Sequence, residues 1–415
     1  MNSFETNFLE TANLIGAKLC RDALRDGTRV NWMGDSRELI GNNWTIAYRT
    51  LGPDLYNGTS GVALFLARLH QFTGEKLYRS TAEGAAYHAL SRLDDVYPTA
   101  RASFYMGLTG IAYGLIEIGE LFDNEIFINE GLKILESSVK EDISQQGLDV
   151  VSGSAGAIPA LLSIYRRYPK DFMLELANNH GEHLLNTAEK ADSGWSWNTL
   201  NIPAQYNLTG FSHGTAGIAW ALFELYKETK EKKFFAAAEQ GINYERHHFS
   251  SQHENWPDFR GLYDQTITTN EPIVYPIAWC HGAAGIGLSR LRLYEILKEE
   301  SYRSEAEIAV RTTMKLFSEN NNFIKSDYSL CHGAAGNTEL LVYASKVLGN
   351  ADYKSFADQI GQIGIQEFQK NNMPWACGVL NGGETPGLML GLAGIGYFYL
   401  RLHDPLLTPP IVIIL

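Results

Sequence analysis

The chain has 415 residues, of which 45% are hydrophobic and 20% charged, a balance typical of a soluble globular protein with a large core. Asp and Glu outnumber Lys and Arg by 47 to 34, so the formal net charge is -13. No dense basic run interrupts this acidic balance, which argues against nucleic acid as the main partner.

The ends of the chain and its cysteines indicate a cytoplasmic protein. Residues 1–5 lack the basic stretch and apolar core of a signal peptide. No apolar run reaches the roughly 20 residues that a membrane span needs, so we expect no membrane insertion. The apolar tail from Ile411 to Leu415 is short and is expected to pack against protein. Four cysteines make no disulfide framework in a chain of this length, which favours the reducing cytoplasm.

A Gly-x-x-Gly step followed by an apolar run occurs seven times. Each run is apolar nearly all round for two to three turns, which is typical of a helix buried on every side. Residues 1–50 contain no such step, and we expect them to form a lead-in segment and the first outer helix. In chain order, the glycine pairs are Gly58/Gly61, Gly107/Gly110, Gly153/Gly156, Gly214/Gly217, Gly282/Gly285, Gly333/Gly336 and Gly391/Gly394.

Amphipathic segments with charged outer faces separate the apolar runs. Residues 77–90, 232–244, 302–317 and 352–368 have this pattern. Each unit therefore combines an amphipathic helix, a loop and a buried helix, and its repetition predicts an all-α fold, an α/α toroid of seven helical hairpins. No linker divides the chain, so we expect residues 1–415 to form a single domain. An open superhelix of hairpins is the alternative arrangement.

In a toroid, all the Gly-x-x-Gly turns lie at one end of the barrel. The glycines would let backbones approach closely and leave N–H groups free at this mouth. Residues just before the glycines would then share one central site, whereas an open superhelix would keep them apart. The long loop from 247 to 276, with turn residues at 256–258 and 270–272, is expected to form a lid or a substrate wall.

One short phrase occurs twice, as Cys280-His281-Gly282 and as Cys331-His332-Gly333. Cysteine sulfur and imidazole nitrogen in one cluster favour zinc over magnesium or calcium. All four side chains are candidate ligands from the residues alone. Four protein ligands would close the tetrahedron and make the site structural, whereas three would leave a position open for a substrate.

Two further polar residues stand just before glycines, where packing does not demand them. His213 precedes Gly214, and Asp149 lies four residues before Gly153. At the mouth of the ring, near a metal, both are candidates for donating and accepting protons. Capping of an inner helix is the alternative role, and it suits the aspartate better than the histidine.

These motifs resemble the lanthionine synthetase C-like cyclases over most of the chain, from about residue 57 to residue 402. The resemblance rests on residues 207–217, 279–282 and 330–333, while residues 384–394 look most like the cyclase part of class II lanthipeptide synthetases. It implies a seven-hairpin α/α barrel with one Zn²⁺ ion. The implied ligands are Cys280, Cys331 and His332, the implied catalytic residues are His213 and Asp149, and His281 is left as a neighbour of the metal.

The resemblance also implies a reaction, in which a peptide cysteine adds to dehydroalanine or dehydrobutyrine in the same precursor and forms a thioether ring. Class II relatives carry a large dehydratase region before the cyclase, and 415 residues have no room for one. We therefore expect either a stand-alone cyclase or an excised domain, with a dehydrated precursor peptide, a separate dehydratase and an exporter as partners. The rival interpretations are an enzyme that adds glutathione, a non-catalytic zinc-stabilised peptide scaffold, and an α/α-toroid glycosidase with paired carboxylates.

Overall fold

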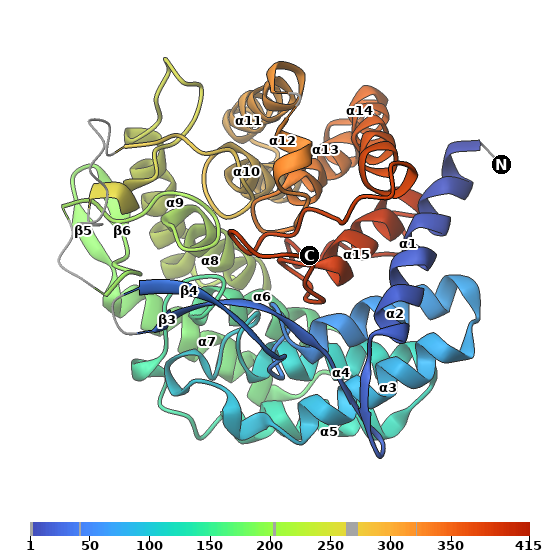
Figure 1. Cartoon of the computed structure of the whole chain (residues 1–415). Helices are drawn as coiled ribbons and strands as arrows, with labels where there is room; N and C mark the ends of the chain where they lie inside the picture. The colour runs from blue at the N-terminus through green and yellow to red at the C-terminus, as the bar shows by residue number, and fades with distance from the viewer. Residues whose placement is uncertain (1–2, 41–42, 202–204, 263–272, 321) are drawn as a thin grey trace.

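The computed structural model describes residues 3–40, 43–201, 205–262, 273–320 and 322–415. In this part of the chain, seven buried helices close into a ring (Figure 1). Each contacts the next along the chain, and the last contacts the first. These inner helices are α2 (Thr59–Thr73), α4 (Leu108–Phe122), α6 (Ser154–Tyr165), α8 (Thr215–Thr229), α10 (Ala283–Leu297), α13 (Ala334–Leu348) and α15 (Leu392–His403).

An outer layer of amphipathic helices surrounds the ring. Six of the outer helices follow their inner partners directly, and α1 (Ser3–Arg21) packs on α15. The predicted α/α toroid is therefore confirmed, and the four amphipathic segments coincide with α3, α9, α11 and α14 to within a few residues. The six are α3 (Lys76–Leu90), α5 (Glu125–Ser138), α7 (Asp171–Thr187), α9 (Lys232–His247), α11 (Glu300–Glu319) and α14 (Ala351–Gly364).

The turns from inner to outer helix are tight because a left-handed residue ends most of the inner helices. Such a residue stops the helix and reverses the chain at once. Two of these positions are glycines, and three hold Asp or Lys at positive φ. The residues, within the described ranges, are Gly74, Asp123, Lys230, Lys298 and Gly349.

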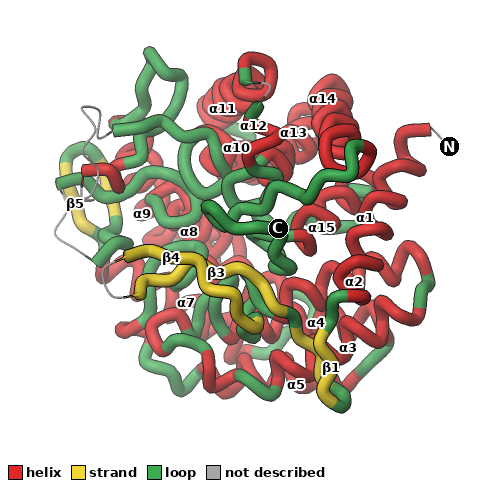
Figure 2. The backbone as a smooth tube through the Cα atoms, viewed as in Figure 1, coloured by secondary structure: helices red, strands yellow, loops and turns green. Residues whose placement is uncertain are grey.

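Three two-stranded antiparallel sheets in the described residues lie outside the ring, and the sequence analysis did not predict them. They pair β1 (Leu24–Asp26) with β2 (Arg29–Asn31), β3 (Met33–Ile40) with β4 (Asn43–Thr50), and β5 (Glu189–Ala191) with β6 (Gly194–Ser196). Figure 2 shows how small this share is beside the helices. Short helical turns complete the connections: Leu93–Asp95, Pro98–Ala100, Ile143–Gln145, Phe259–Leu262, Phe323–Ser326 (α12) and the π-helical Ile365–Lys370.

The second glycine of each step is required by close backbone contact. A Cβ at Gly110 would lie 1.6 Å from the carbonyl oxygen of Phe104, and one at Gly61 would lie 2.3 Å from that of Leu55. In all seven repeats the oxygen belongs to the residue six positions earlier. Any side chain larger than hydrogen would therefore push the loop away from its helix.

The loops also satisfy the first N–H groups of the inner helices. The amide of Thr59 donates to Gly52 at 2.8 Å, and that of Thr215 donates to Leu208 at 3.0 Å, in each case seven residues back. Equivalent bonds begin α4, α6, α13 and α15. These bonds occupy the first N–H group of six inner helices, so the expectation of free N–H groups at the mouth does not hold for those groups.

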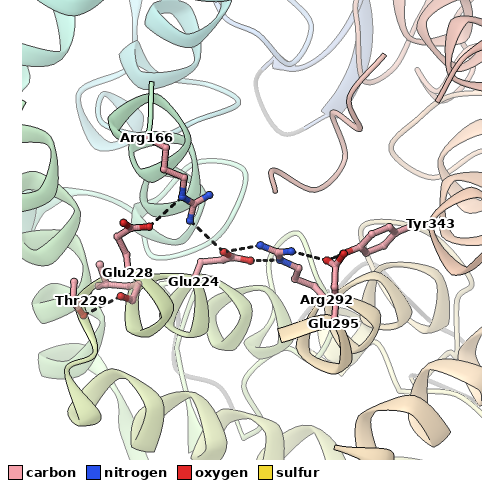
Figure 3. A network of polar contacts seen from close by, with 8 residues as sticks. Arg166, Glu224, Glu228, Thr229, Arg292, Glu295 and Tyr343 are labelled. Carbon is pink, nitrogen blue, oxygen red and sulfur yellow. Dashed lines mark hydrogen bonds and ion pairs between the residues drawn. The ribbon is translucent and has the colours of Figure 1, made fainter. Parts of the chain in front are cut away.

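Charged side chains link the inner helices toward their C-terminal ends, away from the mouth (Figure 3). Glu224 of α8, which is 1% exposed, lies between Arg166 and Arg292. Arg292 also pairs with Glu295, which accepts a 2.7 Å hydrogen bond from Tyr343 of α13. The same helix position, ten residues after the first glycine, holds Arg68, Glu117 and Arg401 in three other repeats. We call the five buried charged residues at this position the charged belt: Arg68, Glu117, Glu224, Arg292 and Arg401.

The apolar tail packs against protein, as the sequence predicted, and it does so in the centre of the ring, which the sequence did not indicate. Ile411 to Ile414 are at most 4% exposed. Tyr105 donates to the carbonyl of Ile411 and Trp279 to that of Val412, both at 2.7 Å. Tyr105 belongs to the second repeat and Trp279 to the fifth, on opposite sides of the ring, so a segment that contacts both lies in its lumen. None of the described helices is long and apolar enough to cross a membrane.

Candidate metal centre and active site

Equivalent positions of the repeats are joined by backbone hydrogen bonds at the mouth. The residues concerned stand two places before the first glycine, and we call them the mouth ring: Tyr56, Tyr105, Val151, Ser212, Cys280, Cys331 and Met389. Each amide in the following series donates to the next repeat: Ser212 to Cys280 (3.0 Å), Cys280 to Cys331 (3.2 Å), Cys331 to Met389 (2.9 Å), Met389 to Tyr56 (2.7 Å) and Tyr56 to Tyr105 (2.8 Å). Cys280 and Cys331 are therefore neighbours although 51 residues separate them.

The structure brings Cys280, Cys331 and His332 together. Their ligand atoms lie within 4.8 Å of one another, and in the described chain they form the one such group of three. The second sulfur and burial raise the pKa of Cys280 well above its ordinary value, while His332 opposes the shift. Two adjacent thiolates need a compensating cation, and two sulfurs with one imidazole are a donor set that suits zinc.

His332 is oriented by groups on the side away from the cysteines. Its Nε2 lies 3.0 Å from the carbonyl oxygen of Gly378 and 3.1 Å from Oδ2 of Asp327. Burial alone would lower the pKa of His332, but the Cys280 sulfur and the Asp327 carboxylate raise it to about 9. With Nε2 bonded to these acceptors, Nδ1 is the nitrogen available to a metal, and a carboxylate behind a ligating histidine is a common support.

His281, the histidine of the first Cys-His-Gly copy, has a different environment. Gly282 has a φ of +82°, whereas Gly333 has an extended φ of -100°. The resulting turn buries His281 to 1% exposure and places its ring 5.9 Å from that of His213. Burial lowers the pKa of His281 to about 3, so the ring is neutral. His281 is outside the group of three, so a metal held by that group would have three protein ligands.

His213 and Asp149 form a hydrogen-bonded pair at the end of the barrel that also holds the three-donor group. Nδ1 of His213 lies 2.6 Å from Oδ2 of Asp149, whose other oxygen accepts from the backbone amide and the hydroxyl of Ser152. Burial alone would lower the pKa of His213, but the Asp149 carboxylate outweighs it and raises the pKa. Asp149 is 4% exposed and holds the imidazole in one orientation. This geometry leaves Nε2 of His213 for proton transfer.

Sequence reasoning missed four residues that surround these groups. Asp327 supports His332, and the Tyr56 hydroxyl lies 2.9 Å from the sulfur of Cys331. Arg260 binds the buried Asp258 with Nε 2.9 Å from Oδ2, and it interacts electrostatically with both cysteines of the group. The place of Tyr56 in the repeat was a usable signal. Residues 256–258 had been interpreted only as a turn, and residues 270–272 lie outside the described residues.

A cavity of about 480 Å³ opens beside His332. Its other walls are Asp327 and the loop from Pro374 to Glu384, between α14 and α15. Leu380 of this loop is 60% exposed. The cavity therefore opens on the Asp327 side of His332, and neither Cys280 nor Cys331 lines it.

Comparisons with known proteins agree with this architecture. The profile of the family described as lanthionine synthetase C-like protein matches residues 49–411. The lacticin 481/lactococcin biosynthesis protein LcnDR2 of Lactococcus lactis subsp. lactis is 24% identical over 388 residues, which cover 90% of this chain and 38% of that protein. The chain therefore spans about two fifths of this relative's length.

Two further similarities extend the comparison. The glutathione S-transferase LANCL1 of Danio rerio is 20% identical over 367 residues, covering 84% of this chain and 82% of the relative. The solved structure of nisin cyclase has the same fold, with a TM-score of 0.66 at 17% identity over 97% of this chain and 96% of that one. The profile match covers most of the chain, and so this protein belongs to the lanthionine synthetase C-like family.

Proposed function

We propose that this chain is a zinc-dependent lanthipeptide cyclase. Its substrate would be a dehydrated precursor peptide, within which cysteine thiols add to dehydroalanine or dehydrobutyrine to form lanthionine and methyllanthionine. One observation carries the proposal: Cys280, Cys331 and His332 form a three-donor group at the same mouth as the His213–Asp149 pair. Three donors leave a coordination position for a thiol, and the pair supplies a proton donor.

Cys280 and Cys331 would hold the zinc through sulfur and His332 through Nδ1. Zinc lowers the pKa of a coordinated thiol, whose free value is about 8.5, so that it reacts as thiolate. The thiolate sulfur bonds to the alkene β-carbon, and the π electrons move toward the adjacent carbonyl as an enolate. The thiol proton would pass to solvent, and His213, protonated on both nitrogens, would then deliver a proton from Nε2 to the α-carbon, so that S and H are added across the double bond.

Two other groups assist this sequence. Asp149 fixes the tautomer of His213 by accepting from Nδ1 at 2.6 Å, and it stabilises the protonated ring. Arg260 places a cation on the wall of the site, where it would stabilise the negative charge of the enolate. Its partner Asp258 is buried and limits the movement of the guanidinium.

The cellular setting is part of the proposal. We place the reaction in the cytoplasm, with residues 1–415 acting as one cyclase unit. A separate dehydratase would supply the precursor, and an exporter would remove the product. Support comes from the name of the Lactococcus relative, a lacticin biosynthesis protein that is longer than its aligned part.

Addition of glutathione is the second candidate activity. The Danio rerio relative carries the name of a glutathione S-transferase and aligns over most of both chains. Glutathione would use the same three-donor group, because its thiol needs the same activation. The two candidates differ in the nucleophile: an internal cysteine conserves mass, whereas glutathione adds its own.

The test uses a dehydrated precursor with free cysteines, incubated with the zinc-loaded protein in the presence of glutathione. Cyclisation is expected to remove free thiols from the peptide without a change in its mass. Cys331→Ala is expected to abolish this loss, whereas the matched variant Cys20→Ala, which alters a cysteine of α1 outside the group of three, should retain it. An unchanged thiol content contradicts the cyclase proposal, and a gain of one glutathione mass favours the second candidate.

A further inference from the structure

Tyr56 occupies the mouth-ring position of the first repeat, the place that cysteine occupies in the fifth and sixth repeats. Its hydroxyl oxygen lies 2.9 Å from the sulfur of Cys331, within the distance of an O–H···S hydrogen bond. The reaction sequence above assigns no role to this contact. A phenol directed at a metal-ligating sulfur nevertheless affects both the position and the charge of that sulfur.

The backbone of the mouth ring holds Tyr56 in place. Met389 stands between Cys331 and Tyr56 in the ring, with its amide bonded to the Tyr56 carbonyl at 2.7 Å. The Tyr56 amide in turn donates to Tyr105 at 2.8 Å. Tyr56 therefore reaches past one repeat to meet Cys331, and it does so from a backbone fixed on both sides.

The ring of Tyr56 is supported as well as its backbone. It meets the ring of Tyr105 edge to face, with centroids 6.2 Å apart and an interplanar angle of 88°. Tyr105 is 1% exposed, and its own hydroxyl is engaged by the Ile411 carbonyl. The phenol of Tyr56 thus rests on an immobile neighbour, which limits the directions in which its hydroxyl can point.

We propose that Tyr56 is a positioning residue of the metal centre, donating its hydroxyl proton to the Cys331 sulfur. This inference rests on the proposed zinc site. The hydrogen bond fixes the Cys331 side chain and draws negative charge away from its sulfur. A zinc ion with a less electron-rich ligand keeps more positive charge for the substrate thiol, which it then activates more strongly.

Tyr56→Phe tests the proposal, because it removes one oxygen atom and keeps the ring. Tyr105→Phe is the matched control, since it removes the hydroxyl of the next mouth-ring residue, which bonds a carbonyl instead of sulfur. Both proteins and the wild type are loaded with Co²⁺, whose thiolate charge-transfer absorption reports on the sulfur ligands. Zinc affinity is measured by competition with a chelator, and kcat and KM are measured with the dehydrated precursor.

In Tyr56→Phe the charge-transfer band is expected to move to lower energy, because the thiolate loses a hydrogen bond that stabilises its electrons. Zinc affinity should fall about 10- to 100-fold, because the Cys331 side chain is no longer held in position and this loss outweighs the stronger donor character of its sulfur. The value of kcat should fall with KM little changed, because Tyr56 acts through Cys331. Tyr105→Phe should match the wild type in band position and zinc affinity.

Three outcomes would separate the ideas. If the wild type shows no thiolate-to-cobalt band, the metal centre itself is wrong. If the wild type shows the band and Tyr56→Phe shares its energy and zinc affinity, only the role of Tyr56 is wrong. Equal changes in both variants would also overturn that role, because they would reflect general loosening. Circular dichroism verifies folding, and Tyr56→Leu, which also lacks the hydroxyl, takes the place of Tyr56→Phe if that variant fails to fold.

Discussion

The two Cys-His-Gly phrases are identical in sequence, yet their histidines lie in different surroundings. Gly333 is extended, and His332 stays at the mouth beside Cys280 and Cys331. Gly282 has a φ of +82°, a conformation open to glycine, and a Cβ there would lie 1.7 Å from the carbonyl of Pro276. One backbone rotation therefore separates a candidate ligand from a buried neutral neighbour.

Replacing each histidine by alanine tests this asymmetry. His332→Ala is expected to lower zinc content strongly, because it removes one of three donors. His281→Ala should keep stoichiometric zinc, although it loses some stability by leaving a cavity. Metal analysis of the purified, folded variants distinguishes them. Loss of zinc in His281→Ala would place that ring among the ligands.

At this scale, positions relative to the glycines made His281 as much a candidate ligand as His332, and only the family resemblance left His281 out of the predicted ligand set. Cys280, Cys331, His332 and His213 stand one or two places before a glycine, and the structure places them at one mouth. Asp327, Arg260 and Tyr56 were not found, because spacing does not show which side chains meet: Asp327 contacts His332 within one loop, and Tyr56 contacts Cys331 across repeats. The burial of His281 depends on a φ angle that sequence spacing does not reveal.

Among the elements, the inner helices are joined by two different kinds of contact along their length. Near the mouth, glycines allow loops and helices to touch. Toward the other end, the charged belt links neighbouring helices through groups such as Arg292 and Glu224. Glu224 is buried away from water, so its arginine partners offset the free-energy cost of desolvating its negative charge.

Arg292→Met is expected to destabilise the protein by about 3–5 kcal/mol, because it leaves the buried Glu224 with only Arg166, whose nearest nitrogen is 3.8 Å away. The matched control is Lys315→Met, which breaks the exposed pair with Glu319 on α11 and should cost about 0–1 kcal/mol. Urea unfolding followed by circular dichroism gives both values. Equal unfolding free energies for the two variants would show that the charged belt stabilises the fold no more than an exposed ion pair does.

Helices were predictable from the sequence, and most of the strands were not. The outer helices show a charged face over several turns, and a Gly-x-x-Gly step marks the start of each inner helix. Strands β1, β2, β5 and β6 have only three residues each, which is too short for an alternating pattern to be recognised. The longer β3 carries polar residues on both faces and lacks a clear period, whereas β4 alternates Trp44, Ile46 and Tyr48 with smaller or polar residues, a pattern that the sequence analysis overlooked.

The whole molecule depends on the closure of the ring. The repeats predicted a toroid, but the pairing of α1 with α15 and of α15 with α2 joins the two ends of the described chain. Such long-range contacts leave no local signal in the sequence. Outer helices also secure the loops, since Glu245 of α9 accepts from the amides of Gly210 and Ala216, at the start of α8.

Glu245 is expected to make stability depend on pH. Burial raises its pKa to about 8, with Arg290 of α10 opposing the shift and Glu305 of α11 adding to it. The folded state therefore keeps a proton that the unfolded state releases near pH 4.5, and stability should fall as pH rises from about 5 to about 8. The maximum slope is about 1.4 kcal/mol per pH unit.

Unfolding free energies across this pH range test the linkage. Glu245→Gln should flatten the dependence, because the amide oxygen still accepts both hydrogen bonds and carries no titrating proton. Glu175→Gln, at an exposed position on α7, is the control and should keep the wild-type slope. A slope that survives in Glu245→Gln would assign the dependence to other groups.

The buried tail also determines the route of a peptide. In the described part of the chain, the buried residues Ile411 to Ile414 occupy the lumen, where Tyr105 and Trp279 hold their backbone. Under the proposed function, a precursor would therefore present a short loop to the mouth and withdraw it by the same route. Each thioether would then be made in a separate visit, and the order of closures would be set by which loop of the peptide reaches the mouth first.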